Sequence, residues 1–330
     1  MIAKYLKGIL GVKRRNEIRR ILSGHITWNP YKDSKHIIAS LYRNENKRGL
    51  GLLRLFIEVL SGPTLNQKIR QRKKHDRDPK LLILENKMKA RNLAIELGIP
   101  VPKLYYATQN AETIPFDTLP NEYVIKTNHL SGMRIQINSL SGLNVMMIQN
   151  GKNLIDGKKY SNRELVLIFN EFLLQKWYPE EWAAFNIDPP MVMIEEMMLN
   201  KGNSTGTPAE DLKCYVFHGR AELFHVDFDR FGCFKRDFYS RSWERLEIEW
   251  EYPNSERSEL KRPKDLEQII DYAEGLASGL HFMRVDFLLT DRESVFGECT
   301  SYPGAGFERL SYWADKYYGW KWNHAEKKVT

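Results

Sequence analysis

The sequence has few cysteines, no long apolar run and no internal repeat. Its 330 residues include three cysteines, Cys214, Cys233 and Cys299, without CxxC or Cys/His spacing. Such a sparse, odd set argues against a disulfide framework and against a structural zinc site. No stretch of about 18 uninterrupted apolar residues is present, and the opening residues carry no secretory cleavage pattern. These absences predict a cytoplasmic protein.

The overall composition excludes disordered, collagen-like and membrane-spanning classes. Hydrophobic residues make up 42% of the chain and charged residues 28%, with a mean hydropathy of −0.51. A disordered chain would be poorer in apolar residues, and a membrane-spanning chain much richer. The length suits one large multi-lobed fold or two modest domains.

Positive charge is concentrated at the N-terminus. Residues 1–80 contain 20 Lys and Arg against 6 Asp and Glu, whereas residues 81–330 contain 30 against 36. Clustered cations attract anionic lipid, acidic polysaccharide or nucleic acid without distinguishing among them. No nucleic-acid-binding module accompanies this charge, so we expect no nucleic-acid partner. Solvated helix faces are the plain alternative.

The first 80 residues predict mainly helical structure. Apolar residues recur at helical spacing among the basic residues of segment 1–24, and a second helix is expected over 50–60. The amphipathic segment could lie on the inner membrane face, or it could pack against the body of the protein. Residues 70–80, RQRKKHDRDPK, are interpreted as an exposed turn or linker.

Beyond residue 80 the pattern predicts an α+β fold with antiparallel sheet. Gly98 follows a helical apolar pattern and is succeeded by prolines, which marks the end of a helix. The expected helices are 86–97, 164–174 and 265–280, and the expected strands are 123–126, 191–196 and 212–217.

The segment RVDFLLTDRESVFGECT predicts a β-hairpin whose turn centres on Arg292. Residues whose numbers sum to 584 then pair, so Asp286 faces Glu298 and Arg284 faces Thr300, all on one face of the sheet. Two opposed carboxylates repel each other unless a cation lies between them. Magnesium favours hard oxygen ligands and is held by one or two carboxylates together with substrate phosphates. The pair therefore predicts a Mg²⁺ and nucleotide site, and neutralisation of both acids by Arg284 is the alternative.

Three further segments suit a nucleotide. Lys126 ends a strand and precedes a small-residue loop with Ser131 and Gly132, a pattern that could hold phosphates. In MVMIEEMM, backbone groups around Glu195, Glu196 and Met197 could bind an adenine edge. Asp211 and Lys213 share a strand face and could contact ribose and phosphate, or form a simple surface pair.

Taken in order, these motifs resemble the ATP-grasp superfamily. The segments GIPVP, VIKTNHLSG, DLKCYVFHGR, RVDFLLT and FGECTSYPGAGF are similar to its TupA-like branch, over most of residues 80–320. That branch is associated with bacterial surface polysaccharide and teichuronopeptide synthesis. The resemblance implies an ATP-grasp fold in which two α+β lobes clamp ATP. It also implies that Lys87 and Lys126 contact the ATP phosphates, that Glu195 to Met197 form the adenine hinge, and that Asp286 and Glu298 bind magnesium.

The resemblance further implies a ligase that activates a carboxylate as an acyl phosphate, which an amine then attacks. Arg284 and Lys213 are the candidates for catalysis, with Arg284 on the transferred phosphate or the acyl-phosphate oxyanion. Thr300 stands where the superfamily usually has Asn, so a third metal ligand stays open and Thr300 becomes a candidate substrate contact. The motif DFDR adds Asp227, Asp229 and Arg230 as candidates for the acceptor substrate.

The expected cofactors are ATP and Mg²⁺, and the expected substrates are an amine and a carboxylate, with a uronic acid of a lipid-linked or polymeric acidic glycan as acceptor. A kinase that phosphorylates a sugar hydroxyl and a non-catalytic nucleotide-binding scaffold are the two alternatives. The expected division is a basic N-terminal region (1–80), a short segment before the ATP-grasp core (81–118), a small lobe (119–196) and a large lobe (197–330).

Overall fold

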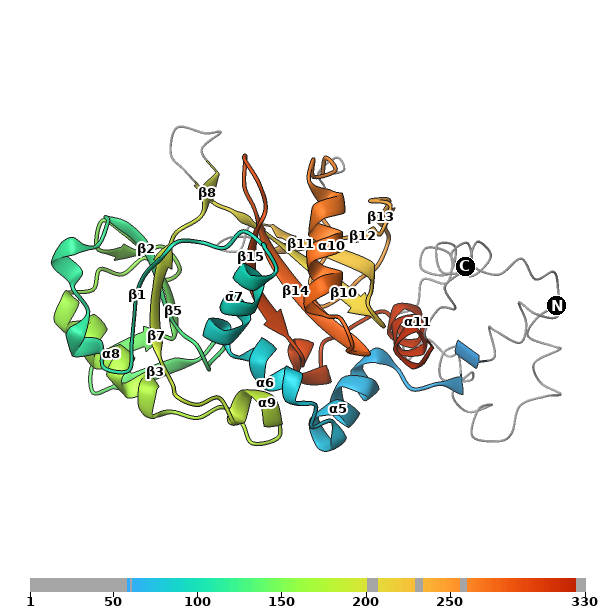
Figure 1. Ribbon diagram of the computed structural model, residues 1–330, viewed down its shortest axis with the longest axis horizontal. Helices are drawn as coiled ribbons and strands as arrows, with labels where there is room; N and C mark the ends of the chain where they lie inside the picture. Colours follow the sequence, from blue (N-terminus) through green and yellow to red (C-terminus); the bar gives the residue numbers. More distant parts are fainter. Residues whose placement is uncertain (1–57, 60, 201–206, 229–233, 256–259, 325–330) are drawn as a thin grey trace.

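Two antiparallel sheets, each with its own apolar core, organise the chain (Figure 1). The structure is a computed structural model and describes residues 58–59, 61–200, 207–228, 234–255 and 260–324. In the smaller sheet, buried and less buried residues alternate along the strands, whereas the central strands of the larger sheet are buried along nearly their whole length.

The small lobe is a five-stranded sheet in the order β1-β7-β2-β5-β6, covered by α8. Helix α8 starts with a capping box, in which the Ser161 hydroxyl accepts from the Glu164 N–H and the Glu164 carboxylate accepts from the Ser161 N–H. The elements of this lobe are β1 (Leu104–Thr108), η1 (Ala111–Thr113), η2 (Phe116–Thr118), β2 (Glu122–Thr127), β3 (Arg134–Ile137), β4 (Leu140–Leu143), β5 (Val145–Gln149), β6 (Lys152–Asn153), α8 (Asn162–Leu174) and β7 (Val192–Glu196). Helix α9 (Trp182–Phe185) precedes β7 in the chain but packs on the core of the large lobe.

The large lobe is a six-stranded sheet in the order β13-β12-β11-β10-β14-β15, with α10 packed on it. The apolar stripe of α10, which includes Ile269, Ile270 and Ala273, is fully buried. The elements are β8 (Leu199–Asn200), β9 (Thr207–Pro208), β10 (Glu210–Phe217), β11 (Arg220–Phe228), β12 (Lys235–Ser240), β13 (Arg245–Leu246), α10 (Leu266–Leu276), β14 (Phe282–Leu289), β15 (Val295–Thr300), η3 (Pro303–Gly306) and α11 (Tyr312–Asn323).

Three helices precede the small lobe: α5 (Leu65–His75), α6 (Pro79–Glu85) and α7 (Lys87–Glu96). Leu65 and Ile69 of α5 are buried in the core of the large lobe, where α5 packs against α11 and η3. Helix α7 lies between the two sheets in Figure 1, and the Lys87 N–H donates to the carbonyl of Asn128, just beyond β2. The N-terminal helices therefore connect both lobes.

The predicted elements between residues 86 and 300 are confirmed, with helix and strand ends shifted by a few residues. The interpretation of residues 70–80 as an exposed linker is wrong. Residues 70–75 form the last part of α5, and Arg72 is buried there because it binds Asp76 and the carbonyl of Phe282. The amphipathic segment 1–24 lies outside the described residues, as does all but residues 58–59 of the expected helix 50–60.

Candidate nucleotide and metal site

The β14–β15 hairpin brings the predicted carboxylates together. Asp286 faces Glu298 and Arg284 faces Thr300, as the sequence predicts. Beyond Asp286 the register shifts by one residue, so that Phe287 faces Phe296. A Cβ atom on Gly297 would lie 3.2 Å from the Asp286 carbonyl oxygen, so this close approach of the strands suits glycine. The irregularity lies directly beside the two acids.

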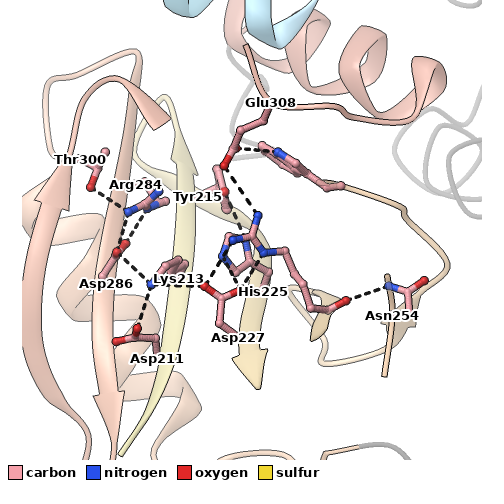
Figure 2. Close-up of polar contacts among 12 residues, drawn as sticks. Asp211, Lys213, Tyr215, His225, Asp227, Asn254, Arg284, Asp286, Thr300 and Glu308 are labelled. Atoms are coloured by element: carbon pink, nitrogen blue, oxygen red, sulfur yellow. Dashed lines mark hydrogen bonds and ion pairs between the residues drawn. The ribbon is translucent and has the colours of Figure 1, made fainter. Parts of the chain in front are cut away.

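Asp286 is enclosed by two cations. The Arg284 guanidinium donates to both of its carboxylate oxygens, at 2.8 and 2.7 Å, and the Lys213 ammonium lies 3.3 Å away (Figure 2). Arg284 also donates to the Thr300 hydroxyl at 2.9 Å. Burial opposes ionisation of Asp286, but Arg284 and Lys213 outweigh it and hold the pKa of Asp286 below its usual range. Asp286 is therefore ionised and pre-positioned.

Lys213 lies at the centre of three buried aspartates. Its ammonium is 3.3 Å from Asp211, 3.3 Å from Asp286 and 3.8 Å from Asp227, which come from β10, β14 and β11 (Figure 2). The predicted pairing of Asp211 with Lys213 is present, but it is part of a buried cluster and not a surface pair.

Glu298 is the more accessible of the two opposed acids, with 32% of its side chain exposed. Its carboxylate lies 3.6 Å from the Lys87 ammonium and 4.0 Å from the Arg284 guanidinium, beyond hydrogen-bonding distance from both. Burial and Asp286 both oppose its ionisation, yet Lys87 and Arg284 lower the pKa of Glu298. Glu298 is thus a charged carboxylate with room for a further ligand.

Lys87 links this hairpin to the predicted phosphate loop. Besides its contact with Glu298, its ammonium donates to the carbonyl of Leu130 at 2.9 Å. Ser131 and Gly132 follow directly, are exposed, and Gly132 has a left-handed φ of 62°. The loop therefore stands next to the lysine that contacts the acidic hairpin.

A second ionic group lies in the small lobe. Lys126 on β2 contacts Glu195 on β7 at 2.5 Å, and Arg91 of α7 lies 3.3 Å from the same carboxylate. Glu195 is buried, so it points into this group and not toward solvent. Sequence reasoning missed Arg91, whose helical position after Lys87 was the available signal.

The chain leaves β7 at Glu196 and Met197. Glu196 is exposed, and its N–H donates to the carbonyl of Lys103 at 2.8 Å. Met197 is buried, and it forms no hydrogen bond within the part of the chain that the structure describes.

Asp227 is bound inside the large lobe. Arg236 on β12 donates to both of its oxygens, at 2.7 and 3.3 Å, and holds its pKa low together with His225 despite burial. Burial, with Arg236 nearby, lowers the pKa of His225 to about 3, so this imidazole is neutral. Arg236 was not singled out from the sequence. Asp229 and Arg230 lie outside the described residues.

The donor set fits one magnesium ion. Asp286 and Glu298 offer hard oxygens on facing strands, and a carboxylate that already accepts hydrogen bonds retains lone pairs for a metal. Among the described residues no three His, Cys, Asp or Glu side chains group as metal ligands. Magnesium is typically held by one or two carboxylates and completes its shell with water and phosphate oxygens.

A model of the TupA-like ATP-grasp family matches residues 67–319. The chain therefore belongs to this family and has the α+β ATP-grasp fold, which confirms the resemblance seen in its motifs. A comparison with curated proteins gives no match. In the described residues, no helix has the length and apolar character needed to cross a membrane.

Solved structures similar to this chain include two D-alanine–D-alanine ligases. The one from Bacillus anthracis is 15% identical, with 66% of this chain aligned to 56% of that chain and a TM-score of 0.36. The one from Helicobacter pylori is 16% identical, with coverage of 74% and 60% and a TM-score of 0.39. The ATP-grasp ligase PsnB, complexed with precursor peptide PsnA2 and AMPPNP, is 12% identical, with coverage of 66% and 48% and a TM-score of 0.33. The chain spans less than two thirds of each.

Proposed function

We propose that the protein is an ATP- and Mg²⁺-dependent ligase that joins an amine to a carboxylate through an acyl phosphate. Membership of the ATP-grasp family supports the use of ATP. The observation that carries the proposal is the pairing of Asp286 with Glu298, beside Lys87, which also donates to the Leu130 carbonyl directly before the Ser131–Gly132 loop. A carboxylate pair and a lysine at one point suit a triphosphate and its counter-ion.

The proposed binding roles follow from position. Lys126 and Lys87 would contact phosphate oxygens, and the Ser131–Gly132 loop would cover them. Glu195, Glu196 and Met197 form the proposed adenine hinge, at the point where the chain leaves β7. Asp211 and Lys213 would contact ribose or phosphate. Asp286 and Glu298 would hold magnesium, which when bound neutralises charge on the triphosphate.

The chemistry needs no protein nucleophile. A substrate carboxylate oxygen attacks the γ-phosphorus, ADP leaves, and an acyl phosphate forms. The amine then attacks the acyl carbon, phosphate leaves and the amine loses a proton. Arg284 would stabilise the transferred phosphoryl group, because its guanidinium is held by Asp286 and Thr300 and needs little reorganisation. Lys213 would add positive charge from its position beside Asp286.

We propose an acidic glycan precursor, with a uronic acid carboxylate, as the acceptor. The support is the excess of positive charge in residues 1–80 together with the family's association with surface polysaccharide. A variant lacking residues 1–24 should bind an oligogalacturonate less tightly, and doubling the salt concentration should weaken binding by the full-length protein more than binding by the variant. If the full-length protein and the variant bind the oligogalacturonate equally tightly at both salt concentrations, this part of the proposal is wrong.

Isotope transfer tests the reaction. A uronic acid library with ¹⁸O in the carboxylates is incubated with ATP, Mg²⁺ and an amino-acid library, and the products are examined by mass spectrometry. The ligase predicts an amide product and one ¹⁸O atom in the released phosphate. A phosphorylated sugar with no released phosphate would identify a kinase instead. Binding of ATP without turnover across the library would identify a scaffold.

A further inference from the structure

The open end of the β14–β15 hairpin is buried against the N-terminal helices. The ladder between the two strands ends at Arg284 and Thr300, and the chain then turns away through Ser301 into η3. Ser301 is fully buried. In Figure 1, α5 and α6 lie at this end of the hairpin, opposite the β14–β15 turn. Peptide groups that leave a ladder inside a protein need other partners.

Arg72 of α5 binds the ends of both strands. Its guanidinium donates to the carbonyl of Phe282, the first residue of β14, at 2.8 Å, and lies 3.5 Å from the carbonyl of Ser301. The side chain is itself fixed, since it donates to Asp76 at 3.0 Å and stacks 4.6 Å from the Trp322 ring. Only 4% of Arg72 is exposed. The planar guanidinium can bridge two acceptors, which an ammonium does less well.

Glu85 of α6 holds the other side of the same residue, because its carboxylate accepts the N–H of Ser301. Ser301 is thus held at its N–H by an acid and approached at its carbonyl by a base, from two different helices. Glu85 stands two residues before Lys87, which contacts Glu298. One short segment therefore touches the hairpin at its end and at its proposed metal ligand.

Ser301, which Arg72 and Glu85 hold, lies close in sequence to the proposed metal ligand Glu298. Ser301 follows Glu298 by three residues, or roughly 10 Å of extended strand. The β-bulge at Gly297 interrupts the ladder on the other side of Glu298. Two ladder positions, Cys299 and Thr300, are all that separate Glu298 from the end of β15. Fraying from that end would therefore move Glu298 relative to Asp286.

We propose that Arg72 and Glu85 are positioning residues, which hold the end of β15 so that Glu298 and Asp286 together bind the divalent ion. The inference rests on the proposed function, because it assumes that these acids bind metal with ATP. Neither residue contacts the metal in this arrangement. They act on Glu298, the proposed metal ligand, through the backbone of Ser301. Helices α5 and α6 thereby become part of the proposed metal site.

Metal affinity of the full-length protein tests the proposal. Mn²⁺ binding is followed by electron paramagnetic resonance in the presence of adenylyl imidodiphosphate, a non-hydrolysable ATP analogue. Residues that orient metal ligands typically change affinity by about 10- to 100-fold. We expect Arg72→Met and Glu85→Met to weaken Mn²⁺ binding by about 10-fold or more, with unchanged affinity for the analogue without metal. Glu85→Gln should retain wild-type Mn²⁺ binding, because its amide oxygen still accepts the Ser301 N–H.

Arg241→Met is the matched control. Arg241 pairs with Glu274 of α10 and donates to the carbonyl of Ala221 at 3.0 Å, so it makes the same kinds of contact away from the hairpin. We expect it to lower stability without changing Mn²⁺ affinity. If Arg72→Met and Glu85→Met both bind Mn²⁺ as tightly as the wild type, the proposal is overturned. If the wild-type protein binds no Mn²⁺ with the analogue, the proposed function itself fails. Should Arg72→Met not fold, the Glu85→Met and Glu85→Gln pair decides.

Discussion

The ammonium of Lys126 on β2 lies 2.5 Å from a carboxylate oxygen of Glu195 on the neighbouring strand β7. Glu195 is buried, so loss of Lys126 leaves a charge that Arg91 neutralises from one side alone. We expect Lys126→Met to lower the free energy of unfolding by about 3 kcal/mol, measured by urea denaturation. Affinity for ATP should fall at least about 10-fold if Lys126 contacts phosphate.

A double variant separates these two effects. Lys126→Met with Glu195→Gln removes the unpaired charge, so stability should recover in part while ATP affinity stays low. Lys103→Met, an exposed lysine before β1, is the control and should change neither quantity. Recovery of ATP affinity in the double variant would show that Lys126 acts on stability and not on phosphate.

Glu298→Gln should separate metal binding from stability. The Glu298 carboxylate is partly exposed and forms no close ion pair, so its loss should change the free energy of unfolding by less than about 1 kcal/mol. Mn²⁺ affinity with the ATP analogue should fall at least about 10-fold, because a neutral amide replaces a charged ligand. Glu293→Gln, in the exposed turn of the same hairpin, should bind Mn²⁺ normally. Equal Mn²⁺ binding by Glu298→Gln and wild type would exclude Glu298 as a ligand.

Glu85 should give the protein a pH-dependent stability. Burial raises its pKa to about 7 from 4.5, although the bonds from Ser301 and the charge of Lys87 oppose this. Between pH 4.5 and 7 the folded protein therefore holds a proton that the unfolded chain releases, so the free energy of unfolding falls as pH rises. The loss attributable to Glu85 is at most about 3 kcal/mol.

Urea denaturation at pH 5 and pH 7.5 measures this slope in the wild type and in Glu85→Gln. The stability of the wild type relative to the variant should be lower at pH 7.5 than at pH 5. His129 and His225, whose pKa values burial lowers to about 4 and about 3, act in the opposite sense but are common to both proteins. The exposed variant Glu96→Gln should follow the wild type. Parallel pH profiles for wild type and Glu85→Gln would contradict the assignment.

Two glycines inside helices test the contact between α5 and α11. A Cβ atom on Gly319 of α11 would lie 2.2 Å from the Pro63 carbonyl oxygen, so Gly319→Ala must push the start of α5 away. We expect a loss of about 1–3 kcal/mol in the free energy of unfolding. Gly275 of α10 has no atom within 4 Å of such a Cβ, so Gly275→Ala should stabilise by up to about 1 kcal/mol. Equal effects of the two substitutions would argue against close packing of α5 on α11.

The pairing of Asp286 with Glu298 could be predicted because alternation of polar and apolar residues fixes the register of a hairpin. The shift at Gly297 could not, since a bulge depends on local backbone geometry. Arg72 and Ser301 are 229 residues apart in sequence, and nothing local indicates their contact. The basic run RQRKKHDR likewise hides the buried Arg72, which differs from its exposed neighbours through its tertiary partners.

The sequence left open whether a metal ion or Arg284 neutralises the two opposed acids. Neutralisation by Arg284 was an alternative to a metal, and the structure has that ion pair. Glu298, in contrast, keeps its oxygens more than 3.5 Å from both neighbouring cations. Two acids that look equivalent in the sequence therefore differ in their surroundings. Arg284, on the same strand as Asp286, causes part of this difference, and Lys213 and Lys87 add to it from distant segments.

The strand order of the large lobe has a consequence for how the acids come together. Strand β14 pairs with β10, although β12, β13 and α10 intervene in the chain. The acids therefore lie on two central strands, β10 and β14, and on the edge strand β15. The connection from β13 to α10 starts at the opposite edge of the sheet. The described part of that connection includes the buried side chains of Ile248 and Trp250, so it is fixed to the core of the large lobe. The acids on β10, β14 and β15 are therefore brought together by strand pairing and not by nearness in the sequence.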